Sequence, residues 1–146
     1  MLTENQLIAL KTILDINTKI CVGGSICLKA YGLMDREIGD LDLFIDKKYL
    51  LDFDTLDQYI SEERSHYEID DATRITMYIK GVKVDLFRVD SYLISSAPWA
   101  IHGLQIQMQN PCLAIAAKVK YSETGEKHVK DIEDLRIKFM NLTNLL

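Results

Sequence analysis

Three aspartates have a spacing that could support phosphoryl chemistry, beginning with Asp40 and Asp42. Leucines at 41 and 43 alternate with them, which predicts a β-strand. Because strand side chains alternate between faces, the two carboxylates should share one face, with Cα atoms about 6.6 Å apart. Like charges on one face repel unless a cation compensates. Mg²⁺ typically takes one or two carboxylates plus phosphate oxygens. The pair therefore predicts a Mg²⁺ (or Mn²⁺) site that also binds phosphate.

Asp85 repeats this arrangement in a second predicted strand, where Val84 and Leu86 flank it and should face the core. If this strand pairs beside that of Asp40 and Asp42, three carboxylates converge, as two-metal phosphoryl or nucleotidyl transfer requires. The alternative is an exposed acidic strand face, the commoner situation for charged side chains.

A glycine turn, Gly23-Gly24-Ser25, follows a short apolar run at 20–22 and precedes a predicted helix. Glycine allows positive φ and close approach of a phosphate, and the first backbone N–H groups of a helix favour anions. Ser25 could cap this helix or hydrogen-bond a phosphate oxygen. The alternative is that the glycines serve turn geometry alone.

The remaining pattern predicts an α+β (α/β-like) domain, a mixed β-sheet flanked by helices. With no linker, repeat or low-complexity tract, we expect residues 1–146 to form a single domain. Hydrophobic periodicity and turn signals predict helices at 3–17, 25–34, 48–63, 111–120 and 127–140, and strands at 20–22, 41–45, 75–79, 82–86 and 104–108.

Composition narrows the class of protein. The 146 residues are 48% hydrophobic and 27% charged, which is typical of a globular domain. A net charge of −5 disfavours broad nucleic-acid binding. The three cysteines form no paired motif, and neither a leader nor a membrane-length apolar run is present, so we expect a cytoplasmic protein that does not contact the membrane.

The ordered set of motifs resembles one family. Val22-Gly23-Gly24-Ser25 followed by Asp40-Leu41-Asp42-Leu43 is similar to the signature of the DNA polymerase β-like nucleotidyltransferase superfamily, and Val84-Asp85-Leu86 resembles its third-carboxylate strand. The resemblance implies the nucleotidyltransferase fold, with Asp40, Asp42 and Asp85 as catalytic metal ligands. It also implies that Gly23, Gly24 and Ser25 bind the triphosphate.

Two further features resemble the abortive-infection (toxin–antitoxin) and antibiotic nucleotidyltransferases. Arg36 precedes Asp40 by four residues, as in their Arg-x-Thr-x-Asp pattern, although Ile38 replaces the threonine. Ala116-Ala117-Lys118, and then Lys130-Asp131 with Asp134, are similar to their C-terminal helices. The resemblance implies nucleotide contacts for Arg36, Lys118 and Lys130. For the lysines, a solvated helix surface is the alternative.

These features together imply transfer of a nucleoside monophosphate from an NTP such as ATP to an acceptor hydroxyl, with release of pyrophosphate. The acceptor, whether a small molecule, a protein or tRNA, is not specified by the sequence, and an oligomer is possible. The alternatives are a non-catalytic, antitoxin-like nucleotide-binding module and a structural domain with an acidic face. His66, His102 and His128 lack zinc-ligand spacing, and we expect Trp99 to lie in a loop and serve packing.

Overall fold

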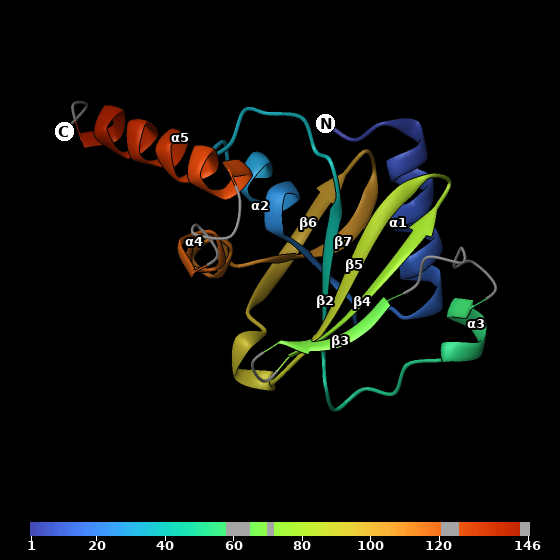
Figure 1. The fold of residues 1–146 in the computed structure, drawn as a ribbon. Coiled ribbons are helices and arrows are strands. Elements are labelled where there is room, and N and C mark those ends of the chain that lie inside the picture. The colour runs from blue at the N-terminus through green and yellow to red at the C-terminus, as the bar shows by residue number, and fades with distance from the viewer. Residues whose placement is uncertain (58–64, 70–71, 121–125, 144–146) are drawn as a thin grey trace.

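A mixed seven-stranded β-sheet organises the chain (Figure 1), in a computed structural model that describes residues 1–57, 65–69, 72–120 and 126–143. The strands are β1 (Cys21–Gly23), β2 (Leu41–Asp46), β3 (Ser65–Ile69), β4 (Ala72–Ile79), β5 (Val82–Val89), β6 (Ser96–Ile101) and β7 (Leu104–Gln109). Their order is β3-β4-β5-β2-β1-β7-β6. β2 runs parallel to β5, and β1 parallel to β7, whereas the other neighbours are antiparallel. The predicted α+β class is confirmed.

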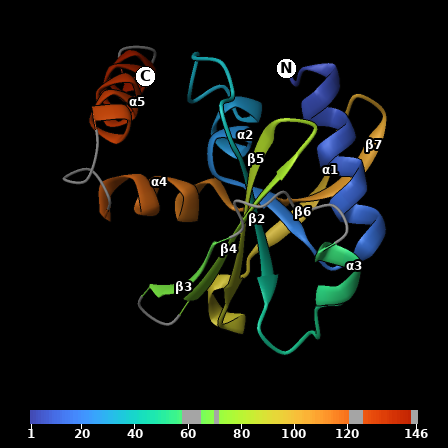
Figure 2. The ribbon, with the colours of Figure 1, turned by 45° about the vertical axis from the view of Figure 1, so that its right-hand side comes forward.

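Helices lie on both flanks of this sheet. They are α1 (Glu4–Ile16), α2 (Gly24–Ala30), α3 (Phe53–Asp57), α4 (Pro111–Lys120) and α5 (Glu126–Thr143), with a 3₁₀ turn, η1 (Ser91–Leu93). Figures 1 and 2 show α1 and α3 on one side of the sheet, and α4 and α5 on the other. Of the helix predicted at 48–63, the described part is helical only at α3, and 58–64 lie outside the described residues. Among the described residues, no helix is both long and apolar enough to span a membrane.

The hydrophobic core covers one face of the two central strands. On β2 and β5, the alternating apolar side chains are completely buried, and they pack in one cluster with residues of α1 and α2: Leu41, Leu43, Ile45, Val84, Leu86, Leu10, Ile13 and Ile26. Because the side-chain period of a strand is two, burial of this set directs Asp42 and Asp85 to the opposite face. The alternation predicted from the sequence is therefore confirmed.

Two strands were not predicted, β3 and β6. β6 lies at an edge of the sheet, where Pro98 is tolerated because the missing N–H is not needed by a further strand. The expectation that Trp99 lies in a loop was wrong, since it belongs to β6 and packs against Tyr31 with ring centroids 4.8 Å apart. The side chains of His66 and His128 lie outside the described part of the chain.

Candidate functional site

One row of residues crosses four strands on the face opposite the core. Thr76 of β4 pairs with Asp85 of β5, Asp85 pairs with Asp42 of β2, and Asp42 pairs with Gly23 of β1. Neighbouring strands lie about 4.8 Å apart, so the carboxylates of Asp42 and Asp85 project side by side. The sequence analysis required the strand of Asp85 to pair beside that of Asp42, and the register shows that it does.

Hydrogen bonding fixes the orientation of Asp85. Its side chain is buried, the Thr76 hydroxyl donates to Asp85 Oδ1 at 2.6 Å, and Lys83 Nζ lies 4.0 Å from Asp85 Oδ2. A hydrogen bond to an ionised carboxylate is short and strong. Thr76 therefore holds one oxygen of Asp85 and leaves the other directed toward Lys83.

Asp40 is half-buried and stands one residue before β2. Because the pairing of β2 with β5 begins at Leu41, Asp40 flanks the Asp42–Asp85 pair and is not part of their row. Within the described ranges, no three His, Cys, Asp or Glu side chains are gathered closely enough to hold a metal ion by themselves. The paired carboxylates nevertheless fit Mg²⁺ or Mn²⁺, hard cations that take one or two carboxylates and complete their coordination with phosphate oxygens and water. The donor set suits a metal that arrives with a phosphate ligand.

The glycine turn packs directly on this pair. Gly24 has φ +57°, and a Cβ added to it would lie 2.3 Å from Asp42 Oδ2. A Cβ on Gly23 would lie 2.3 Å from Gln109 Oε1 and 2.6 Å from Phe44 Cε2. The Gly24 N–H donates to Gln109 Oε1 at 3.1 Å. Both glycines are thus required by close packing, and Gly24 in addition by its positive φ.

Gly24→Ala is expected to displace the Asp42 carboxylate as well as strain the backbone. Gly103→Ala is the matched control, because Gly103 has φ +78° but nothing within 4 Å of an added Cβ. Positive φ costs alanine about 1 kcal/mol in either variant. We expect the Gly24 variant to lose at least about 1 kcal/mol more than the control, as overpacking does. Chemical denaturation measures the difference in free energy of unfolding. Equal losses in the two variants would show that the Asp42 side chain can move away from the added Cβ without cost.

Ser25 connects the turn to a buried ionic cluster. Arg36 donates to Ser25 Oγ through Nη2 at 2.9 Å and to both oxygens of Asp131, at 2.7 and 3.0 Å. Lys118 Nζ lies 2.8 Å from Asp131 Oδ2, and Ser25, Lys118 and Asp131 are all buried. Ser25 does not cap the helix, because the N-cap residue of α2 is Gly23. α2, α4, α5 and the loop before β2 therefore meet at one point.

Two cations control the ionisation of Asp131 in this cluster. Burial by itself raises the pKa of Asp131, but hydrogen bonds from Arg36 and Lys118 and their positive charges hold that pKa below its ordinary value. Asp131 is therefore ionised at neutral pH. Arg36 and Lys118 both face this carboxylate, and Arg36 also reaches Ser25.

The predicted site residues separate into groups in the structure. Arg36 and Lys118 belong to the Asp131 cluster together with Ser25, whereas Lys130 is exposed on α5 and is not brought to this cluster by any described contact. Sequence reasoning missed Thr76 and Gln109. A polar residue between Ile75 and Met77 on an alternating strand is the signal that could have found Thr76.

Comparisons with known proteins identify the fold. No family model and no curated protein matches the sequence. A candidate nucleotidyltransferase from Thermotoga maritima matches with a TM-score of 0.65 and 19% identity, over 97% of this chain and 96% of that chain. An antigenic nucleotidyltransferase-like protein from Paracoccidioides brasiliensis matches with a TM-score of 0.52 and 16% identity, over 92% and 75%. JHP933 from Helicobacter pylori matches with a TM-score of 0.50 and 20% identity, over 94% and 67%. The chain therefore has the fold of nucleotidyltransferase-like proteins.

Proposed function

We propose that this protein is a Mg²⁺-dependent nucleotidyltransferase that moves a nucleoside monophosphate from an NTP to an acceptor hydroxyl and releases pyrophosphate. The observation that carries the proposal is the in-register pairing of Asp42 with Asp85 beside the glycine turn. A structural sheet face has no need of two adjacent carboxylates, because like charges side by side are destabilising. On the fold of nucleotidyltransferase-like proteins, this pair is the natural place for a metal that accompanies a triphosphate.

The carboxylates have distinct roles in this proposal. Asp42 and Asp85, with Asp40 beside them, would bind the metal, which neutralises charge on the phosphates and lowers the pKa of a bound hydroxyl. Asp85 would also help to deprotonate the acceptor hydroxyl; its Oδ1 accepts from Thr76, and Lys83 Nζ lies 4.0 Å from its Oδ2. Most of the rate would come from positioning and charge neutralisation.

The β- and γ-phosphates would lie near Ser25. Its hydroxyl accepts from Arg36, so its proton is available to a phosphate oxygen. The positive charges of Arg36 and Lys118, which lie behind Ser25, would attract the triphosphate. In this arrangement, Lys130 would be exposed to solvent and would not contact the nucleotide.

A direct test is incubation with each α-labelled NTP, a cell extract and Mg²⁺, followed by identification of the labelled product. We expect a labelled acceptor that depends on the protein and on Mg²⁺, and that disappears on addition of a chelator. Binding of NTP without label transfer, over a broad set of extracts and all four NTPs, would instead support the antitoxin-like binding module. Absence of both binding and transfer would support a structural domain.

Thr76→Val is expected to loosen Asp85 without removing a charge. Valine matches the shape of threonine but cannot donate to Asp85 Oδ1. We expect the Mg²⁺ concentration for half-maximal activity to rise by about tenfold to a hundredfold, as a lost hydrogen bond to a charged group predicts. Thr76→Ser should restore the parent value. An unchanged Mg²⁺ dependence in the valine variant would show that Thr76 has only a packing role.

A further inference from the structure

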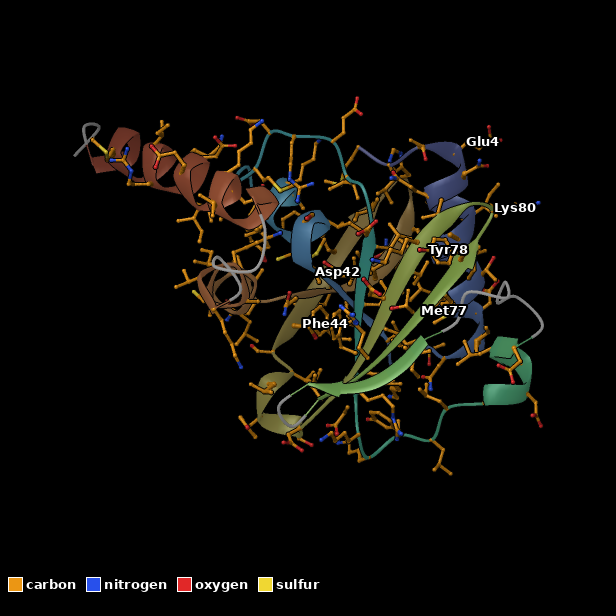
Figure 3. The ribbon with its side chains drawn as sticks, in the orientation of Figure 1. Glu4, Asp42, Phe44, Met77, Tyr78 and Lys80 are labelled. Carbon is orange, nitrogen blue, oxygen red and sulfur yellow. The ribbon has the colours of Figure 1, made fainter. Side chains whose placement is uncertain are left out.

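Two aromatic side chains lie immediately beside the carboxylates, on the same face of the sheet. Phe44 is two residues after Asp42 on β2, and Phe87 is two residues after Asp85 on β5, so all four side chains share a face. Figure 3 shows Asp42 and Phe44 in succession along β2. The rings of Phe44 and Phe87 are stacked, with centroids 5.1 Å apart and planes 17° from parallel.

This aromatic pair is not part of the core. Both residues are only half-buried, while the apolar residues that alternate with them, Leu43, Ile45 and Leu86, are completely buried on the other face. A strand with one open face normally places polar residues there. Phenylalanine at both register partners instead leaves a stacked, partly exposed aromatic pair at a position that solvent reaches.

We infer that Phe44 and Phe87 form the contact surface for the nucleobase of the bound NTP. The inference rests on the proposed function, because it needs the triphosphate at the neighbouring carboxylates. A shift of two residues along a strand is about 6.6 Å, which leaves room for one ribose between the α-phosphate at Asp42 and a base at Phe44. Phenylalanine contacts a base through ring faces and edges without reading its hydrogen-bonding pattern.

The geometry of Phe44 supports this placement. Its ring lies close to Gly23, where a Cβ would stand 2.6 Å from Phe44 Cε2. The glycine turn proposed to hold phosphate and the ring proposed to hold the base are therefore in direct contact. On the other side, Phe87 pairs with Arg74 of β4, so these two side chains leave the sheet on the same face. A single nucleotide could span from Ser25 to this pair.

The test compares ATP, the other three NTPs and inorganic tripolyphosphate as ligands, with Mg²⁺ present and no acceptor. We expect the parent protein to bind every NTP more tightly than tripolyphosphate. Phe44→Leu and Phe87→Leu should each weaken NTP binding by about tenfold, in line with the loss of one stacking contact, and leave the tripolyphosphate Kd unchanged. The matched control is Tyr31→Leu, which breaks the other described ring pair, Tyr31 with Trp99.

The outcomes separate this inference from the function beneath it. If the parent binds tripolyphosphate and NTP equally, or if the leucine variants keep the parent preference for NTP, the nucleobase assignment is wrong while the phosphate site stands. If the variants bind NTP as the parent does but transfer less label in the cell-extract assay, the aromatic pair binds the acceptor and the inference fails. If neither ligand binds the parent protein, both the proposed function and this inference are wrong.

Discussion

Asp42→Asn and Asp85→Asn should each reduce nucleotidyl transfer by a factor of a hundred or more. An amide cannot supply the negative charge that a metal ligand needs, and loss of such a ligand removes several kcal/mol of transition-state stabilisation. The measurement is the rate of label transfer at saturating Mg²⁺ and NTP. Asp54→Asn is the control, since Asp54 is exposed on α3, on the other flank of the sheet.

Stability of the same variants distinguishes a metal site from an acidic surface. Each substitution removes one of two adjacent like charges, but Asp85→Asn also removes the charge opposite Lys83, so the stability of the metal-free variants does not decide between the two. The discriminating quantity is the rise in melting temperature on addition of Mg²⁺ and NTP, which should shrink in both variants. Should Asp85→Asn retain full transfer and the full rise, the carboxylates are not the metal site.

Local pattern was sufficient to predict much of the central sheet. The alternation around Asp42 and Asp85 correctly assigned the core face and the opposite face of β2 and β5. The alternation could not predict which strand pairs with which, because pairing depends on segments far apart in the chain, as the register partners Asp42 and Asp85 are. The row from Thr76 to Gly23 could therefore not be predicted without the strand register.

The ionic cluster at Ser25 shows the same limit more strongly. Arg36 and Asp131 are separated by 95 residues in the chain, yet they form two hydrogen bonds. Lysine and arginine are usually solvated, and composition alone gives no reason to bury Lys118. The family resemblance implied nucleotide contacts for Arg36 and Lys118. In the structure, Arg36 and Lys118 both pair with the Asp131 carboxylate. Any attraction of a triphosphate would therefore come from the whole cluster and not from one isolated cation.

Asp131→Ala is expected to be the most destabilising substitution among the polar residues of the site. It would leave Arg36 and Lys118 facing each other without their shared carboxylate, and breaking a buried ion pair costs about 3–5 kcal/mol. The control is Glu133→Gln on the same helix, whose exposed pair with Arg136 should contribute less than about 1 kcal/mol. Chemical denaturation at neutral pH gives both free energies of unfolding.

Acid titration of stability provides an independent check on the same carboxylate. Because the pKa of Asp131 is lower in the folded protein than in the unfolded chain, its ionised form stabilises the fold at neutral pH. That contribution is complete above about pH 4 and is lost as pH falls through the folded pKa. The free energy of unfolding should therefore fall less steeply below about pH 4 in Asp131→Asn than in the parent. Parallel curves would show that Arg36 and Lys118 do not lower the pKa of Asp131.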